Sequence, residues 1–357
     1  MAARYRVFLF LLCLSLPAFA RQNADAKVAS AETEAAPLHE SEVTLDVVVT
    51  DRAGKPVTGL QQQDFTVLDN KKPQAVVTFK AVQQDVATGE PAAKVILVVD
   101  EVNASYQSLA YERAEIKRFL QLNGGKLVQP VSLAFFSDKG TAIQNGSTRD
   151  GNALLTAFDE NRNGLREVRR SAGYWGAAER YEMSLTTLSS LVERETKGPG
   201  RKLLVWISPG WPLLSGPNVL MTKSQQRGIF GSIVKLTTEL QRAHVTLYMV
   251  DPFGAGASIS RQFYYESFVK GVSSDRGVQS GNLALQVLSI QSGGLVLNAS
   301  NDIASRITRA ANDANAYYVL SMKIPPVEHS DEYHSVQVKV NKPGLTVRTR
   351  TGYYAQP

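Results

Sequence analysis

Short, unbroken apolar runs alternate with stretches of helical spacing through most of the chain. The runs occupy residues 94–100, 131–136, 203–207 and 245–250, with shorter ones at 295–297 and 317–320. Such runs are typical of strands buried on both faces of a parallel sheet. Between them, apolar residues recur every three or four positions, which predicts amphipathic helices. These helices are expected around residues 181–192, 229–240, 283–290 and 303–314. The alternation predicts a doubly wound, Rossmann-like α/β domain over residues 92–320.

A period-two, β-branched pattern precedes and follows this domain. It predicts short strands separated by turns rich in Gly, Pro, Asp and Asn. The strands are expected at residues 43–50, 65–68, 75–79, 335–340 and 345–350. Neither part is long enough for its own core, but together their roughly 85 residues suit one sandwich. We therefore predict that the α/β domain is inserted in a discontinuous Ig-like β-sandwich, made of residues 42–90 and 321–357.

The first twenty residues have the features of a secretory signal peptide. Arg4 and Arg6 precede an apolar run at residues 7–14, and Ala18-Phe19-Ala20 is a small-residue cleavage site. The run is too short to span a bilayer, and no later run reaches about 18 apolar residues. We expect cleavage after Ala20, a flexible linker over residues 21–41, and export to the periplasm or the medium with no membrane span after cleavage.

Composition excludes several classes of function. The only cysteine, Cys13, lies in the predicted signal peptide, so the exported chain has no disulfide or thiolate chemistry. Lipidation of Cys13 is disfavoured because Leu12 stands where a small residue is wanted. Lysine and arginine (39) exceed aspartate and glutamate (33) by six. This excess is small and spread along 357 residues, so no nucleic-acid partner is expected.

Several segments, in order and spacing, resemble the VWFA-related domain family of bacterial exported proteins. They are residues 47–60, 64–67, 72–74, 98–103, 202–210 and 338–354. The resemblance covers nearly the whole exported chain. It implies a von Willebrand factor A-like fold, associated with adhesion and protein–protein contact rather than catalysis. It also implies a metal-ion-dependent adhesion site at the carboxyl ends of the strands.

In that family the metal loop reads Asp-x-Ser-x-Ser, with one carboxylate and two hydroxyls as ligands for a hard divalent cation. Here Asp100 is in place, but Val102 and Ala104 replace the two hydroxyl residues. No carboxylate lies near residues 208–210, where the family has a later aspartate. We therefore expect a degenerate site without a cofactor, in which Asp100 caps the following turn. The alternative is a variant site for Mg²⁺ or another divalent cation, built from Asp100, Asn103, Ser105 and Asp251.

No constellation for catalysis is assembled in the sequence. A G-x-S-x-G elbow is absent, and the four histidines give no H-E-x-x-H motif. Gly254 and Gly256 lack the third glycine of a dinucleotide loop, because Ile259 stands there. We expect that the protein is not an enzyme.

A long connection, residues 251–281, holds an aromatic cluster among glycines and serines. Aromatic side chains are favoured anchors of interfaces, so this loop, Trp211 and the Asp100 loop form the predicted partner-binding surface. The cluster comprises Phe263, Tyr264, Tyr265 and Phe268. The alternative is that these rings pack against the β domain.

A basic cluster follows the middle of the chain, with Tyr174 and Trp175 just beyond it. It comprises Arg162, Arg166, Arg169 and Arg170. The cluster could bind an anionic partner such as nucleic acid or an acidic protein surface. Because Glu160 and Glu167 dilute its charge, a solvated face flanking a helix is the favoured interpretation.

The predicted function is that of an exported, non-enzymatic module for protein–protein interaction or cell adhesion. Two alternatives stay open. One is a divalent-metal-dependent adhesion module with the variant ligands, and the other is a scaffold subunit of an envelope complex that docks through its β-sandwich. The expected partner is a protein, and the sequence carries no signal for an oligomeric state.

Overall fold

The computed structural model describes residues 42–84, 92–161, 173–214, 221–253 and 264–356. The predicted signal peptide, the linker, the arginine cluster, the Gly254–Gly256 turn and Phe263 lie outside the described residues. No helix in the described part of the chain is both long and apolar enough to cross a membrane.

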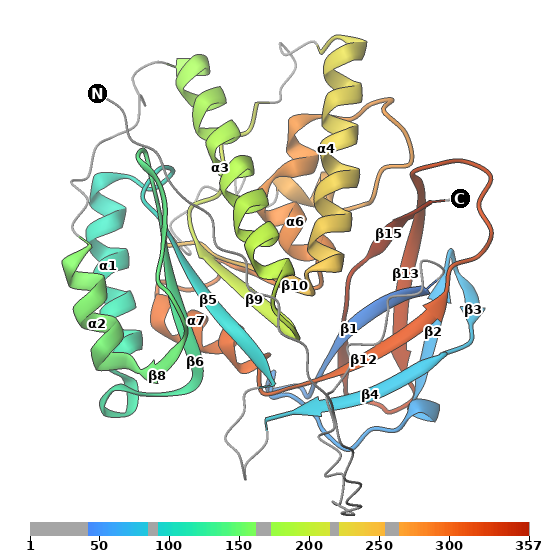
Figure 1. Cartoon of the computed structure of the whole chain (residues 1–357), viewed down its shortest axis with the longest axis horizontal. Helices are drawn as coiled ribbons and strands as arrows, with labels where there is room; N and C mark the ends of the chain where they lie inside the picture. The colour runs from blue at the N-terminus through green and yellow to red at the C-terminus, as the bar shows by residue number, and fades with distance from the viewer. Residues whose placement is uncertain (1–41, 85–91, 162–172, 215–220, 254–263, 357) are drawn as a thin grey trace, which may run out of the picture. The chain divides into compact units, whose positions relative to one another are not determined.

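A seven-stranded, mostly parallel sheet forms the centre of the α/β region (Figure 1). Its order is β11-β10-β9-β5-β6-β7, and β8 pairs with β6 off this path. The strands are β5 (Ala93–Asp100), β6 (Lys126–Ser137), β7 (Gly140–Ile143), β8 (Thr148–Asp150), β9 (Arg201–Ile207), β10 (Val245–Val250) and β11 (Val296–Leu297). Only β7 and β8 run antiparallel to β6. The four long apolar runs of the sequence thus form neighbouring parallel strands, as predicted.

Helices cover both faces of this sheet, which explains why its strands lack a polar side. On one face, Val95, Leu97 and Val99 pack in a core with α1 (Tyr106–Leu120), α2 (Gly151–Glu160) and α7 (Ile303–Asn312). On the other face, Ile96 and Val98 pack with further helices. Those helices are α3 (Gly173–Thr196), α4 (Lys223–Arg242) and α6 (Leu285–Gln291). The prediction of an α/β class with a parallel sheet is confirmed.

Strands from the two ends of the described chain pair in two antiparallel sheets. The first has the order β14-β1-β12-β4, and the second has the order β15-β13-β2-β3. The strands are β1 (Glu42–Thr50), β2 (Phe65–Asp69), β3 (Lys72–Gln74), β4 (Thr78–Gln83), β12 (Ala316–Lys323), β13 (Glu332–Val340), β14 (Thr346–Arg348) and β15 (Gly352–Ala355). The two sheets share one core, in which Leu45 and Leu320 meet Val67, Val338 and Tyr353.

Two strands differ from the sequence-based expectation. Residues 317–320 belong to β12, which pairs with β1 and β4 instead of joining the parallel sheet. The apolar run fits either place, because periodicity does not encode the pairing partner. The strand expected at residues 75–79 is replaced by β3 and β4, which flank it. Pro73 lies in β3, at the sheet edge, where the missing N–H costs no ladder bond.

Four short 3-10 helices complete the connections in the described segments. They are η1 (Gln62–Asp64), η2 (Leu122–Gly125), η5 (Tyr264–Phe268) and η6 (Ser280–Leu283). Among them, η2 leads into β6, and η5 contains Tyr264, Tyr265 and Phe268 of the aromatic cluster.

Buried charges join the antiparallel strands to the amino edge of the parallel sheet. Arg201, at the start of β9, donates to the backbone oxygen of Asp313 (2.9 Å) and to the hydroxyl of Tyr248 (3.2 Å). The Asp313 carboxylate accepts from Arg348 of β14 at 2.6 Å. His244 lies 3.1 Å from Asp46 of β1. The Arg348–Asp313 ion pair and the His244–Asp46 contact therefore tie the antiparallel strands to the amino edge of the parallel sheet.

Candidate functional site

The candidate site lies where β5 and β9 end, at Asp100 and Ser208. The two strands are neighbours, but the chain leaves β5 toward α1 on one face and reaches β9 from α3 on the other. The carboxyl ends of strands at such a switch point are where doubly wound sheets bind ligands. The structure therefore places Asp100 at the position that the sequence analysis predicted.

Protein donors occupy the whole carboxylate of Asp100. Its Oδ1 accepts from the backbone N–H groups of Val102 (3.0 Å) and Asn103 (2.9 Å). Its Oδ2 accepts from the Asn103 amide (2.9 Å) and from the indole N–H of Trp206 (3.0 Å). The Ser208 hydroxyl forms a further hydrogen bond with this side chain. A carboxylate offers about four lone-pair sites, so these donors leave Asp100 no free acceptor.

The acidic groups around this edge titrate above their usual range. Burial raises the pKa of Asp100, and its hydrogen bonds lower the pKa by less. Burial also raises the pKa of Glu101 to about 7, against the opposing charge of Arg113. The pKa of Glu112 is raised well above its usual value, first by burial and then by the charges of Asp100 and Asp251. Burial and like charge thus favour the protonated forms of these acids.

The other predicted metal ligands are each engaged elsewhere. The Asn103 amide also donates to the Ser184 hydroxyl (2.9 Å). The Ser105 hydroxyl caps α1 by accepting from the Ser108 N–H (3.1 Å). Asp251 accepts from the Phe253 N–H (2.9 Å) through its carboxylate. The structure brings Asp100 and Asn103 together but gives Ser105 and Asp251 other partners.

The chemistry of this donor set does not fit a divalent cation. Mg²⁺ and Ca²⁺ need oxygen ligands, whereas Trp206 and Asn103 turn N–H groups toward Asp100. Among the residues that the structure describes, no group of three or more His, Cys, Asp or Glu side chains is arranged to hold a metal. A cation at Asp100 would first have to displace the indole.

Trp211 is not on the surface, contrary to the prediction that it contacts a partner. Its side chain is buried, at 4% exposure, and its ring meets that of Trp206 edge-on with centroids 5.4 Å apart. The ring packs behind the Asp100 site because Trp206 offers it an aromatic face in the core. Trp211 thus supports the site from inside.

The described part of the aromatic loop packs partly on the β domain. Tyr264 and Phe268 of η5 stack with centroids 5.3 Å apart, and they and Tyr265 are half-buried. The Phe268 ring lies against Gly281, where an added Cβ would come within 2.8 Å. Further along, the Val272 carbonyl accepts from Tyr354 of β15 (2.9 Å). The rings of η5 therefore pack mainly on η6 and α6 of the α/β region, and the contact with β15 comes from Val272, which is outside the aromatic cluster.

A more exposed aromatic set lies on elements that start or end at the carboxyl edge. Trp175 is 78% exposed and Tyr174 is 53% exposed, and their rings meet edge-on at 5.7 Å. They lie in the first turn of α3, a helix of 24 residues, or about 36 Å, that projects past the sheet (Figure 1). Phe253, just after β10, and Tyr111 of α1 are also exposed. The sequence drew attention to Tyr174 and Trp175, but only as part of a solvated face.

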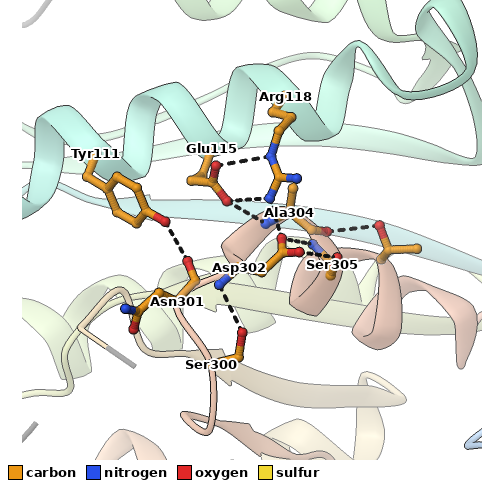
Figure 2. A network of polar contacts seen from close by, with 9 residues as sticks. Tyr111, Glu115, Arg118, Ser300, Asn301, Asp302, Ala304 and Ser305 are labelled. Atoms are coloured by element: carbon orange, nitrogen blue, oxygen red, sulfur yellow. Dashed lines mark hydrogen bonds and ion pairs between the residues drawn. The ribbon is translucent and has the colours of Figure 1, made fainter. Parts of the chain in front are cut away.

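A network of polar contacts fixes the loop that enters α7 beside this edge. Figure 2 shows Tyr111 donating to the Asn301 carbonyl (2.6 Å) and Glu115 accepting from the Ala304 N–H (3.3 Å). Arg118 bridges Glu115 and Asp302, and Asp302 caps α7. These contacts tie α1 to the start of α7, and they include the hydroxyl of Tyr111, one residue of the exposed aromatic set.

No protein-family model and no curated protein sequence matches this chain. Von Willebrand A domains and pilus adhesins are among the solved structures to which it is similar. The SpRpn10 VWA domain is 9% identical with a TM-score of 0.31, over 61% of this chain and 94% of that one. The pilus adhesin SpaC from Lactobacillus rhamnosus GG is 8% identical with a TM-score of 0.37, over 85% and 49%. The human COPII-coat protein Sec24c is 10% identical with a TM-score of 0.35, over 78% and 46%. The chain spans about half the length of SpaC and of Sec24c.

Proposed function

We propose that this protein is an exported, non-enzymatic module that binds a protein partner through the carboxyl edge of its parallel sheet, without a metal. The observation that carries the proposal is the closed Asp100 site, where Val102, Asn103 and Trp206 supply the donors. In this proposal the α/β region is a VWFA-like domain with a degenerate metal site. The two antiparallel sheets form the Ig-like sandwich around it, and residues 1–20 direct export to the periplasm or the medium.

The exposed aromatic set supports a protein partner. Large aromatic side chains bury much area at little entropic cost, which is why they anchor interfaces. Four of them, Tyr111, Tyr174, Trp175 and Phe253, are more than 40% exposed on elements that meet at one edge. Fold alone does not define this role, so the proposal depends on the surface and not on the likeness to other structures.

Substitution of the exposed rings tests this function directly. The protein, immobilised through its C-terminus, is used to capture partners from an envelope extract, and bound proteins are quantified by mass spectrometry. We expect Tyr174→Ser with Trp175→Ser to abolish retention of the captured partner. The matched control is Val77→Ser, which changes an apolar side chain that is 44% exposed, next to β4 of the β domain. This variant should retain the partner.

The two alternatives give different results in the same experiment. Unchanged capture by the Tyr174→Ser/Trp175→Ser variant would contradict the edge surface. Loss of capture with Val77→Ser alone would favour a scaffold that docks through its β-sandwich. Capture that needs Mg²⁺ and is lost with chelator would favour the metal-dependent module.

A further inference from the structure

The outer face of α7 lies between two surface segments that are far apart in the sequence. Polar residues follow one another on this face at helical spacing: Ser305, Thr308, Arg309 and Asn312. On one side, the turn at residues 53–56 and these α7 side chains enclose a groove of about 410 Å³. On the other side, Thr308 and Asn312 also line a smaller hollow of about 50 Å³ beside η2 and the start of β6. The two hollows thus lie on either side of α7 and share Thr308 and Asn312, so we treat them as one surface.

The turn beside α7 is held in one conformation. The Asp51 carboxylate accepts from the N–H groups of Ala53 and Lys55, both at 2.9 Å. Gly54 has a φ of 78°, a conformation that glycine adopts without strain. The Arg309 guanidinium lies directly over Gly54, in space that any Cβ would fill. The missing side chain at Gly54 therefore makes room for Arg309 in the groove.

Three cations on this surface have no acidic partner. Lys55, Lys126 and Arg309 are exposed, and none lies within ion-pair distance of a carboxylate among the described residues. The start of α7 differs, because Arg118 there is neutralised by Glu115 and Asp302 (Figure 2). The helix dipole favours a cation in the last turn of α7, but Lys55 and Lys126 are not on that helix. The helix dipole therefore does not account for all three unpaired cations on this surface.

An apolar shelf adjoins these cations. Val128 of β6 is 53% exposed and Leu122 of η2 is 36% exposed, and both line the smaller hollow with Lys126. Exposed apolar side chains next to unpaired cations are complementary to a chain that carries carboxylates and an apolar residue close together.

We propose that this face of α7 binds an acidic segment of a partner protein that also carries an apolar anchor. The carboxylates meet Arg309, Lys55 and Lys126, with the planar Arg309 guanidinium suited to bidentate contact. The apolar residue covers Val128 and Leu122. None of the exposed aromatic residues lines either hollow, so this surface does not depend on the carboxyl-edge proposal.

Peptide binding to the full chain tests this surface. Three short fluorescent peptides are used, composed of Glu and Leu, of Glu and Ser, and of Lys and Leu, and binding is followed by anisotropy. We expect the Glu/Leu peptide to bind most tightly and to weaken as salt rises, because exposed charges are screened. The double variant Lys55→Glu/Arg309→Glu should weaken it by at least about tenfold, since attraction becomes repulsion.

Matched variants separate the surface from net charge and folding. Lys223→Glu/Lys339→Glu makes the same change in net charge at two other exposed lysines and should bind as the unmodified chain does. Val128→Ser should weaken only the Glu/Leu peptide, because Glu/Ser has no apolar anchor. Gly54→Ala should weaken both acidic peptides by displacing Arg309, and thermal unfolding of each variant verifies its fold.

Three outcomes of the charge comparisons would each overturn the proposal. They are no binding of the Glu/Leu peptide, equal binding of Glu/Leu and Lys/Leu, and equal effects of the two double variants. Equal affinity for Glu/Leu and Glu/Ser would also overturn it, because the apolar shelf would then contribute nothing.

Discussion

Asp46 and Asp100 are both enclosed carboxyl groups, but the pKa of Asp46 is lowered and the pKa of Asp100 is raised. Asp46, on β1, lies at the amino edge of the parallel sheet, whereas Asp100 lies at its carboxyl edge. At the amino edge, burial raises the pKa of Asp46, but the hydrogen bond and charge of His244, with the charges of Arg201 and Arg350, outweigh it and lower the pKa overall. At the carboxyl edge, Asp100 receives only neutral donors, so its pKa stays raised. The comparison teaches that the amino edge is held together by paired charges, whereas the carboxyl edge keeps the perturbed acids typical of functional sites.

The largest expected effect comes from breaking the amino-edge pairing. Arg348→Met removes the guanidinium that pairs with the buried Asp313 carboxylate at 2.6 Å and leaves that carboxylate undercompensated. We expect the free energy of unfolding in urea to fall by about 3 to 5 kcal/mol. The control Arg242→Met alters an exposed arginine in the last turn of α4 and should change it by less than about 0.5 kcal/mol. Equal stability of the two variants would show that the pairing is not structural.

A smaller effect is expected from removing the indole donor at the carboxyl edge. Trp206→Phe deletes the N–H that binds Asp100, which should cost about 1 to 3 kcal/mol beyond the loss of ring volume. Trp211→Phe is the matched control, because the Trp211 N–H is buried without a hydrogen-bond partner among the described residues. Urea unfolding of both variants measures the difference. If Trp211→Phe is as costly, the bond to Asp100 contributes little.

The pH dependence of stability should sharpen the contrast between the edges. The folded protein holds a proton on Glu101 up to a pKa of about 7, while the unfolded chain loses it near 4.5. Stability therefore falls as pH rises from about 4.5 to about 7, and Glu101→Gln should reduce this slope. Asp100 and Glu112, whose pKa values are also raised, contribute with the same sign in both proteins. Asp46 acts in the opposite sense, since its stabilisation is present above 3.8 and is lost as pH falls below that value. Urea unfolding across pH measures both, and an unchanged slope in Glu101→Gln would contradict the assignment.

Local patterns predicted the parallel sheet well because burial on both faces leaves an unmistakable apolar run. The position of Asp100 and its turn-capping bonds to Val102 and Asn103 followed from the same local pattern. Pairing partners were not encoded locally, which is why residues 317–320 were assigned to the wrong sheet.

The long-range contacts at the site could not be predicted from local sequence patterns either. The bond from Trp206 to Asp100 joins residues 106 positions apart, and it turns a buried strand residue into part of the site. Trp211 was expected on the surface because loop aromatics often anchor interfaces, but Trp206 gives it a buried partner. No local signal distinguished the exposed pair Tyr174 and Trp175 from buried rings, because two adjacent residues of a helix can both be buried, as Leu191 and Val192 of α3 are.

Thermal unfolding with and without divalent cations tests the central claim most directly. The chain of residues 21–357 is melted with chelator and then with millimolar Mg²⁺, Mn²⁺ or Ca²⁺. Because the donors to Asp100 are N–H groups, we predict the same melting temperature in every condition. A bound cation at a hundred times its dissociation constant would add about 2.7 kcal/mol, or roughly 5 to 10 °C for a domain of this size. A shift of that size that disappears in Asp100→Asn would contradict the account and establish a metal site.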